Sequence, residues 1–487
     1  MEIIKTEALS FTYPKVSEKA LDSVSISVES GELVLLCGRV GSGKSTLLRL
    51  LKHELAPNGV MEGSLNVSAK KVAYVSQCAE NTFVSERVRG ELAFALENEG
   101  MDSDRISLKI GELASFFNLA AILDKKLSEL SGGEKACVAV AAAVIADADL
   151  LLLDEPLAQL DPKSAEELIS LVRRLNSELG MTVIIASHIT DGLTELCTRM
   201  ILLDGGRLAC DGTPNKLSQL DECLPFFPIY TSLFEERPLT VRDAQRCQKR
   251  FEEKPYIPSE KSVDDAVSLR HISFAYSKNS PDVLSDLTLG VKRGERHFII
   301  GANGSGKTTL LKLIAGIKKS YSGKVKCGGR CAYVPQEPRY LFTEDSVGEE
   351  ISAQTAKRFS LDKFLKRHPY DLSGGQLQLL AFAKVSELGF DILLLDEPTK
   401  SLDFEGKALV RAELDELKEQ GKTVIIVSHD LDFAGECADS ISFLSDGFIA
   451  LTGDRRDVLS SMSFYTTQIR RITASYLSSA VSAEDLL

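Results

Sequence analysis

The sequence repeats one short pattern twice, and this repeat limits the chain to a two-part architecture. GRVGSGKS at residues 38–45 recurs as GANGSGKT at residues 301–308, each between a short apolar run and a helical pattern. Other motifs keep the same spacing, since Tyr13 and Tyr276 both lie 31 residues before the lysine of their loop. A repeat of domain size predicts one folded unit per copy. Because 487 residues exceed what one hydrophobic core holds, we predict two similar domains, at 1–235 and 266–487.

Two segments depart from the repeat. Residues 236–265 are polar and contain prolines at 238, 255 and 258, so we predict a linker there, part of it helical. The second difference is one of length: Gln77 to Ser131 spans 54 residues, whereas Gln336 to Ser373 spans 37. We therefore expect one subdomain to be shorter in the second half.

Composition argues against several functions. Acidic residues exceed basic ones, 70 against 57, which gives no support to a nucleic-acid partner. The longest apolar run, Cys137 to Ala146, is about half of the roughly 20 residues that a membrane span needs. The N-terminus MEIIKTEALSF lacks the basic and apolar regions of a signal peptide. We expect a cytoplasmic protein whose membrane role is peripheral.

The ten cysteines show no regular pairing. The closest two, Cys327 and Cys331, flank Gly-Gly-Arg at the start of an expected strand. A metal site would need a second pair nearby. We therefore predict reduced structural thiols.

The two glycine-rich loops predict phosphate sites. Glycines allow backbone amides to turn toward phosphate groups at a helix N-terminus, where the helix dipole favours anions. Lys44 and Lys307 each add a positive charge, and the hydroxyls of Ser45 and Thr308 suit Mg²⁺, which prefers oxygen ligands. The predicted nucleotide-binding residues of these loops are Gly38, Arg39, Val40, Gly41, Ser42, Gly43, Lys44, Ser45 and Thr46, and Gly301, Ala302, Asn303, Gly304, Ser305, Gly306, Lys307, Thr308 and Thr309.

Two apolar runs that end in acidic residues predict the groups that bind Mg²⁺ and activate water. LLLLDE at 150–155 and ILLLDE at 392–397 are patterns of buried parallel strands with carboxylates at their C-terminal ends. A carboxylate at that position can simply cap the next turn, but the paired loops favour catalysis. We assign Asp154 and Asp396 to Mg²⁺, and Glu155 and Glu397 to the water that they orient and deprotonate.

A third strand pattern delivers a histidine in each half. MTVIIASH ends at His188 and KTVIIVSH ends at His429. A single histidine after an apolar run is more often a core or capping residue, but its repetition favours a functional role. We predict that each histidine hydrogen-bonds the γ-phosphate.

A fourth motif, LSGGE at 130–134 and LSGGQ at 372–376, precedes a helical stretch of small residues. A serine and two glycines before a helix form another anion-binding N-terminus. Together with both phosphate loops, this motif resembles the signature set of the ABC ATPase superfamily, over nearly the whole chain. The resemblance implies an α/β fold of two P-loop NTPase domains, each a mixed, mainly parallel sheet core with a helical subdomain. It also implies hydrolysis of ATP with Mg²⁺.

In that superfamily two domains pair head to tail, so that each ATP lies between one domain's phosphate loop and the other's signature. The resemblance implies the same pairing between the halves of this chain. The first loop would share its nucleotide with Ser373, Gly374, Gly375 and Gln376, and the second with Ser131, Gly132, Gly133 and Glu134. Tyr13 and Tyr276 would stack on adenine, while Gln77 and Gln336 would sense Mg²⁺ and couple to a membrane partner.

Some residues depart from the usual motifs. Glu134 stands where glutamine is commoner, and AQLD at 158–161 and KSLD at 400–403 replace SALD or SGLD. None of these changes removes a catalytic group, so we expect two competent sites of unequal rate.

Three passages are similar to the fused ATPases of energy-coupling factor importers for vitamins and for cobalt or nickel ions. They are VSERVRGELAFALEN (84–98), RPLTVRDAQR (237–246) and SFYTTQIRRI (463–472). The resemblance implies an integral-membrane coupling protein and a small substrate-binding membrane subunit as partners, with the chain at the cytoplasmic face of the cell membrane. Leu92 and Phe94 would line the groove for the coupling helices, or else belong to the core.

Other branches fit less well. Soluble twin-ATPase translation factors carry a longer charged helical insert and an NHLD-type loop, which this sequence lacks. Fused sugar-import ATPases usually lack the lysine that stands here as Lys307. A DNA-repair ATPase would need zinc-binding cysteine pairs. We therefore favour the importer branch, with a ribosome-acting factor or another ABC importer as the alternatives.

Overall fold

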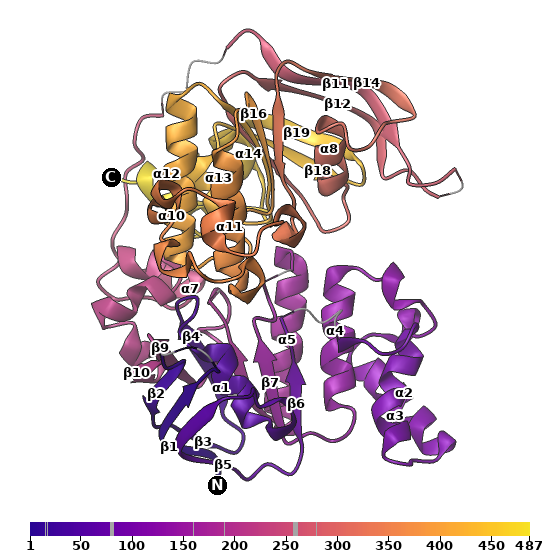
Figure 1. Cartoon of the computed structure of the whole chain (residues 1–487), viewed down its shortest axis with the longest axis vertical. Coiled ribbons are helices and arrows are strands. Elements are labelled where there is room, and N and C mark those ends of the chain that lie inside the picture. The colour runs from indigo at the N-terminus through magenta and orange to yellow at the C-terminus, as the bar shows by residue number, and fades with distance from the viewer. Residues whose placement is uncertain are drawn as a thin grey trace. The chain divides into compact units, whose positions relative to one another are not determined.

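A computed structural model describes residues 1–14, 16, 18–77, 82–158, 160–188, 190–256, 262–278 and 280–487. Backbone packing divides the chain into two compact units, Met1–Thr240 and Val241–Leu487, and many of their elements are labelled in Figure 1. Most of the segment predicted as a linker falls within the second unit, and its residues 257–261 lie outside the described positions.

The first unit is built on a six-stranded sheet of order β10-β9-β4-β8-β7-β6, in which only β9 and β10 are antiparallel. Strand β4 is buried on both faces, because Leu35 and Cys37 enter one core cluster while Val34 and Leu36 enter another. The strands are β4 (Leu33–Gly38), β6 (Val72–Val75), β7 (Leu150–Asp154), β8 (Thr182–Ala186), β9 (Arg199–Asp204) and β10 (Arg207–Gly212).

An antiparallel sheet and several helices complete this unit. Strand β1 pairs with β2, β3 and β5, and it shares an apolar core with α1 and the main sheet. The antiparallel strands are β1 (Glu2–Thr12), β2 (Leu21–Val24), β3 (Ser27–Glu29) and β5 (Val60–Val67). The helices are α1 (Lys44–Leu51), α2 (Val88–Asn98), α3 (Ser103–Phe116), α4 (Gly132–Val144), α5 (Pro162–Leu179) and α6 (Pro214–Leu217).

The second unit repeats this plan, with a six-stranded main sheet and a second sheet in which the single long strand β12 takes the place of β2 and β3. Its main sheet has the order β15-β16-β17-β13-β18-β19, with only β18 and β19 antiparallel, and its second sheet has the order β12-β11-β14. The fold class predicted from the sequence is therefore confirmed. The strands are β11 (Asp265–Phe274), β12 (Leu284–Lys292), β13 (Arg296–Ile300), β14 (Ser322–Cys327), β15 (Cys331–Val334), β16 (Ile392–Asp396), β17 (Thr423–Val427), β18 (Ser440–Ser445) and β19 (Phe448–Asp454).

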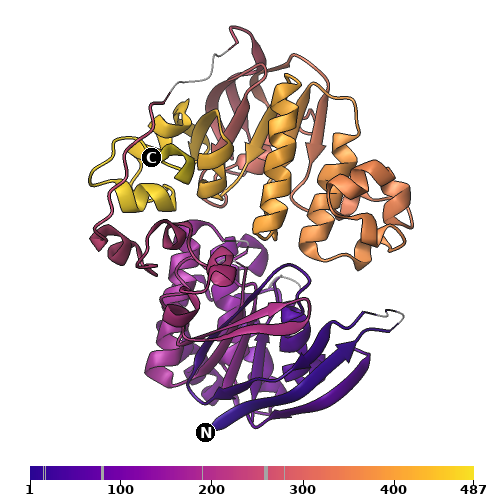
Figure 2. The same ribbon diagram turned by 90° about the vertical axis from the view of Figure 1, so that its left-hand side faces the viewer.

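The helices of the second unit are shorter between the sheet and the signature. There α9 (Val347–Glu350) and α10 (Ala353–Arg358) take the place of the longer α2 and α3. The stretch from Gln336 to Ser373 is therefore shorter than the stretch from Gln77 to Ser131 because its helices are shorter. Figure 2 shows this orange group beside the long helix α12. The remaining helices are α7 (Val241–Arg246), α8 (Lys307–Ile314), α11 (Gly374–Ser386), α12 (Phe404–Glu419), α13 (Leu431–Cys437), α14 (Arg455–Ser461) and α15 (Gln468–Thr473).

Helices from the two ends of the second unit lie together. The helix α7, from the predicted linker, packs against α15 near the C-terminus, and Gln245 Nε2 donates to the carbonyl of Arg471 at 2.8 Å. These helices carry two of the three importer-like passages. In the part of the chain that the structure describes, no helix combines the length and the apolar character that crossing a bilayer requires.

Candidate active site

The glycine-rich loop of the first unit connects β4 to α1 at the C-terminal edge of the main sheet. Gly38, Gly41 and Gly43 have φ values of 153°, 81° and 96°, in the region that favours glycine. A Cβ at Gly38 would lie 2.3 Å from the carbonyl oxygen of Leu203 in β9. The loop is therefore shaped by its glycines and pressed against the sheet.

The loop of the second unit, between β13 and α8, has the same construction. Gly301, Gly304 and Gly306 have φ values of 155°, 80° and 103°. A Cβ at Gly301 would lie 2.2 Å from the carbonyl oxygen of Leu444 in β18. Within each unit, the structure thus brings all the predicted loop residues into one strand–turn–helix segment.

Each loop lysine is almost fully buried and folds over its own loop. Lys44 Nζ donates to the carbonyls of Gly38 and Arg39 at 2.8 and 3.0 Å. Lys307 Nζ donates to those of Gly301 and Ala302, both at 2.8 Å. Each ammonium group therefore stands at the centre of its loop.

Two loop serines indicate that the loops fit phosphate. The hydroxyls of Ser42 and Ser305 are buried, and they hydrogen-bond to none of the residues in the described ranges. A buried hydroxyl without a partner is costly. A phosphate oxygen in the loop is the kind of group that would satisfy it, so both loops fit the polyphosphate of a nucleotide.

A hydroxyl and a carboxylate meet beside each loop. Ser45 Oγ donates to Asp154 Oδ1 at 2.9 Å, and Thr308 Oγ1 donates to Asp396 Oδ1 at 3.1 Å. Burial raises the pKa of Asp154, and burial with the adjacent Glu397 raises the pKa of Asp396 to about 6. A divalent cation would counter this effect by favouring the ionised carboxylates. The oxygen donors fit Mg²⁺, which keeps several waters when bound.

Among the described residues, no group of three or more His, Cys, Asp or Glu side chains is placed to hold a metal ion. Gln77 and Gln336, the other predicted Mg²⁺-sensing residues, each lie two residues beyond a strand, β6 and β15. Gln77 is half-buried and Gln336 is exposed.

Each aspartate is supported by a tyrosine that was not among the predicted site residues. Tyr74 donates from its hydroxyl to Asp154 Oδ2 at 3.0 Å, and Tyr333 donates to Asp396 Oδ2 at 3.1 Å. The signal was available in the repeat, because the tyrosines of VAYV and CAYV stand three residues before Gln77 and Gln336. Such supporting hydrogen bonds fix the orientation of metal ligands.

In the first unit the glutamate after the strand is held by the predicted histidine. His188 Nδ1 lies 2.7 Å from Glu155 Oε2, and the His188 backbone N–H donates to the same oxygen at 3.2 Å. Burial alone would raise the pKa of Glu155, but the charge and hydrogen bond of His188 outweigh it and hold that pKa below its usual value.

The second unit repeats this pair with Glu397 and His429, whose Nδ1 lies 2.8 Å from Glu397 Oε2. Burial again opposes the charged forms, yet the pair lowers the pKa of Glu397 and raises the pKa of His429. Both glutamates also have left-handed backbone, with φ of 52° at Glu155 and 54° at Glu397. Non-glycine residues adopt this conformation at a cost, which is typical of functional positions.

The tyrosines expected at adenine lie next to the start of α1 and α8. Tyr13 and Tyr276 hydroxyls lie 3.0 Å from the Oγ1 atoms of Thr46 and Thr309. Tyr276 is 57% exposed, and Lys318 Nζ lies 5.7 Å from the centre of its ring. The structure thus brings both tyrosines to their phosphate-loop helices.

The signature motifs form the N-termini of α4 and α11. Ser131 N donates to Glu134 Oε2 at 2.7 Å, and Glu134 N donates to Ser131 Oγ at 3.3 Å. Ser373 and Gln376 form the same reciprocal cap. The glycines that follow each serine, Gly132 and Gly133 or Gly374 and Gly375, are the first residues of the helix.

The aspartates that end AQLD and KSLD cap the next helices. Asp161 accepts from Lys163 N and Ser164 N at the start of α5. Asp403 accepts from Gly406 N at the start of α12. Gln159, within AQLD, lies outside the described residues. The two aspartates therefore fix the starts of the helices that follow Glu155 and Glu397.

The predicted groove residues differ in their surroundings. Leu92 is fully buried in the main core cluster, so it takes the core role, whereas Phe94 is 43% exposed on α2.

One family model and several relatives that match this chain describe ABC transporter proteins. A family model described as "ABC transporter" matches residues 21–158 and again 284–400. The chain is 38% identical to a "Putative ABC transporter ATP-binding protein" of Bacillus cereus, over 98% of this chain and 96% of the relative. It is 31% identical to a protein of the same name from Clostridium tetani, over 78% of this chain and 95% of that one.

Solved structures show the same fold. The chain resembles one in "Model of ribosome-bound archaeal Pelota and ABCE1" with a TM-score of 0.69 and 23% identity, covering 93% of this chain and 79% of that chain. A complex of the archaeal ribosomal stalk protein aP1 and ribosome recycling factor aABCE1 gives a TM-score of 0.64 and 22% identity, with 93% and 91% covered. At these identities the likeness concerns the fold alone.

Proposed function

This chain belongs to the ABC transporter family as a tandem of two ATP-binding, ATP-hydrolysing domains, and on that premise we propose that it powers a membrane importer of the energy-coupling factor type. The cargo class would be a vitamin or a transition-metal ion. The chain would sit at the cytoplasmic face of the cell membrane, bound to an integral-membrane coupling protein and a small substrate-binding membrane subunit.

The ATP chemistry would use two composite sites. Each unit supplies a phosphate loop with a central lysine, and each supplies one signature at a helix N-terminus. We propose that each nucleotide is bound by the loop of one half and the signature of the other, in head-to-tail pairing. Fusion favours this pairing, because a tether commonly gives an effective concentration in roughly the millimolar range.

The residues of each half would divide the work of hydrolysis. Ser45 with Asp154, or Thr308 with Asp396, would hold Mg²⁺, which supplies charge stabilisation at the phosphates when bound. Glu155 and Glu397 would orient a water molecule and accept its proton. His188 and His429, which hydrogen-bond to these carboxylates, would position them and contact the γ-phosphate.

The packing of α7 against α15 is the observation that carries the importer branch. The passages RPLTVRDAQR and SFYTTQIRRI are far apart in sequence, yet Gln245 of one donates to Arg471 of the other. The two importer-like passages form helices that pack against each other. This contact supports a shared structural role for the passages, which two separate sequence similarities alone would not. The net charge of −13 further disfavours binding to a nucleic-acid backbone.

The unequal helical subdomains support an asymmetric membrane partner. The first unit offers α2 with Phe94 exposed, while the second offers short α9 and α10 and an 86% exposed Tyr340. Two different surfaces suit two different helices of a coupling protein. Cross-linking that finds both halves gripping equivalent helices in the same way would count against this arrangement.

The test is to isolate the tagged full-length chain from its native membranes in mild detergent and identify its partners by mass spectrometry. Two integral-membrane proteins, one of them small, are expected. Ribosomal proteins in their place would overturn the proposal in favour of a translation factor. A pair of similar transmembrane subunits would point to another ABC importer.

A matched pair of variants sharpens this experiment. Phe94→Asp is expected to lose the membrane partners while ATP hydrolysis by the isolated chain is kept. Leu179→Asp, at a 60% exposed position that ends α5, should keep them. Loss of partners in both variants, or in neither, would contradict a docking role for Phe94.

A further inference from the structure

Two cysteines face each other where the two sheets of the second unit meet. Cys327 is the last residue of β14, in the antiparallel sheet, and Cys331 is the first residue of β15, in the main sheet. Their Sγ atoms lie 2.8 Å apart. Cys327 is exposed and Cys331 is half-buried, so the pair is open to small molecules in solution.

The three residues between the thiols are anchored to the protein. Gly328 N donates to the carbonyl of Ala266 at 2.7 Å, and Arg330 N donates to Asp391 Oδ2 at 2.9 Å. Because the connection is tied down at both ends, the two sulfurs are held near each other by the fold itself. Little conformational freedom would be lost if a bond formed between them.

The repeat shows that the fold does not require these thiols. In the first unit the matching strand β5 ends at Val67, and the next strand, β6, begins at Val72. Val72 is the first residue of VAYV, which stands where the second unit has CAYV. Valine thus meets the packing needs of this junction. The second unit thus differs from the first by carrying a thiol at both ends of this connection.

The two thiols differ in reactivity. The hydrogen bond from Cys331 lowers the pKa of Cys327 to about 7, and the same contact raises the pKa of Cys331. Thiolates are the reactive form of cysteine. The chain holds a contrasting pair, Cys210 and Cys223, with sulfurs 3.3 Å apart, where burial raises the pKa of Cys223 to about 12.

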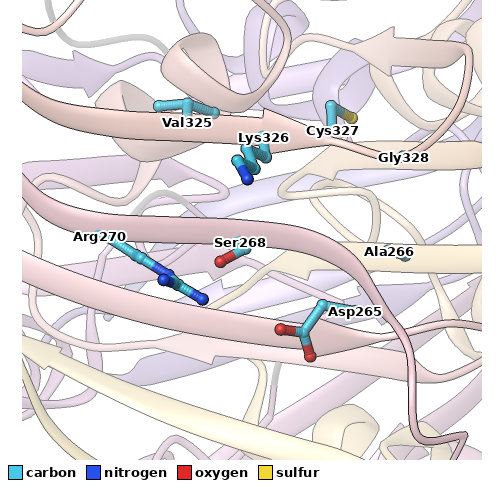
Figure 3. A pocket seen from close by; sticks show the side chains of 8 residues that line it. All are labelled: Asp265, Ala266, Ser268, Arg270, Val325, Lys326, Cys327 and Gly328. Carbon is cyan, nitrogen blue, oxygen red and sulfur yellow. The ribbon is translucent and has the colours of Figure 1, made fainter.

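The surroundings leave the segment accessible. A surface hollow of about 640 Å³ is lined by residues of β11 and β14, among them Lys326 and Cys327, and by Gly328, which follows β14. Figure 3 shows Lys326 on one side of β14, with Cys327 and Val325 projecting from the other. The connection between the strands is therefore approachable from solvent on the hollow side, while the sulfur of Cys327 faces Cys331.

We propose that Cys327 and Cys331 are a reversible disulfide site, oxidised by exchange with a small disulfide. The Cys327 thiolate attacks one sulfur of that disulfide and releases its first thiolate. Cys331 then loses its proton to solvent and attacks Cys327 Sγ in the mixed disulfide, which releases the second thiolate. The protein pair gives up two electrons and two protons, and the small disulfide becomes two thiols. The new bond joins the two sheets covalently.

The test uses the full chain and oxidised glutathione. After exposure, free thiols are blocked with N-ethylmaleimide and the protein is digested with trypsin, which cleaves after Lys326, Arg330 and Arg339. Residues 327–330 and 331–339 are expected as one joined species that dithiothreitol separates. Recovery of both peptides alkylated, or with glutathione still attached, would overturn the proposal. So would equal oxidation of Cys210 and Cys223.

Variants and kinetics give independent readouts. Cys331→Val, which copies the first unit, should leave one glutathione on Cys327, and Cys223→Val should keep the joined peptides. At pH 7 Cys327 in the reduced protein should react with iodoacetamide roughly three- to sixfold faster than an ordinary exposed thiol. The assignment would be contradicted if Cys327 reacted no faster than an ordinary exposed thiol. Loss of the joined peptides in Cys223→Val would contradict it as well.

Discussion

His429 holds Glu397 twice, since its Nδ1 lies 2.8 Å from Glu397 Oε2 and its backbone N–H donates to the same oxygen at 3.2 Å. His188 and Glu155 repeat the relationship in the first unit. The direction of each of these carboxylates therefore depends on the histidine that follows the next strand. This coupling makes the two pairs the most informative targets for mutation.

Glu155→Gln and Glu397→Gln keep the side-chain shape but cannot accept a proton. Each is expected to slow hydrolysis at its own site by about 10²–10⁴-fold, the usual range for loss of a general base, with ATP binding kept. Steady-state phosphate release should then show a remainder from the other site in each single variant and none in the double variant. Equal, near-complete loss in both single variants would argue against independent sites.

The pair Glu397–His429 should make stability depend on pH. The pKa of His429 is raised in the fold, so its contribution is full below its ordinary pKa of about 6.5 and declines as pH rises through the raised value. The pKa of Glu397 is lowered, so its contribution is full above about 4.3 and is lost as pH falls through the lowered value. Lys307 and Asp430 also face His429, with opposite effects on its pKa.

The pair therefore stabilises the second unit most between about pH 4.3 and 6.5. Urea denaturation of wild type and His429→Gln should show a larger difference in unfolding free energy at pH 5.5 than at pH 9. A difference that is the same at both values, or larger at pH 9, would show that the ion pair contributes nothing. His271→Gln, at a 77% exposed ion pair, is the control.

Tyr333→Phe removes the hydroxyl that donates to Asp396 Oδ2. Loss of a group that orients a metal ligand typically weakens metal affinity by about 10- to 100-fold. The Mg²⁺ concentration for half-maximal ATP hydrolysis should rise accordingly in a Glu155→Gln background, where the second site is read alone. Tyr340→Phe, at an exposed position, should leave it unchanged. An unaltered Mg²⁺ requirement in Tyr333→Phe would refute the supporting role.

Gly301→Ala places a methyl group against the carbonyl of Leu444 at a backbone angle that alanine avoids. Overpacking and backbone strain each cost about 1–3 kcal/mol, so we expect clear destabilisation of the second unit and loss of ATP binding. Gly290→Ala is a matched control, because its added methyl would find its nearest neighbour at 3.5 Å. Thermal unfolding monitors both, and equal midpoints would contradict the steric argument.

Glu134→Gln removes a negative charge from the signature of the first half while its amide oxygen can keep the cap, as Gln376 does. If that signature completes the site at Lys307, the change should tighten ATP binding there by roughly three- to tenfold, the size of one charge acting through partly screened protein. Gln376→Glu should weaken ATP binding at the Lys44 site. Unchanged affinity in both variants would contradict composite sites.

The repeat in the sequence predicted the fold because apolar strands, glycine turns and helix starts are local signals. The run from Leu33 to Cys37 reads as a buried strand because each of its side chains enters one of two core clusters, and the mainly parallel sheet was implied by the family resemblance. The tyrosines behind Asp154 and Asp396 were overlooked because a tyrosine in a strand reads as ordinary core. The left-handed backbone at Glu155 and Glu397 leaves no mark in residue type, because only the surrounding structure imposes it.

Long-range partners were equally hidden. Nothing in the spacing of RPLTVRDAQR and SFYTTQIRRI states that α7 packs on α15, because such contacts depend on where the chain returns. Leu92 and Phe94 stand two residues apart on one helix, yet one is buried and the other is exposed. Their separation reflects the helical turn, which places neighbours at that spacing on different faces.

The close approach of Gly38 to Leu203 also bears on the order of events during synthesis. The loop at 38–45 is made early, but the strand that forms its wall, β9, follows more than 150 residues later. ATP therefore cannot assist folding until most of the first unit has been translated. The described strands of that unit all precede residue 213, so the first phosphate loop can gain its wall before the second unit is made, while the proposed composite site still waits for the signature at residues 373–376.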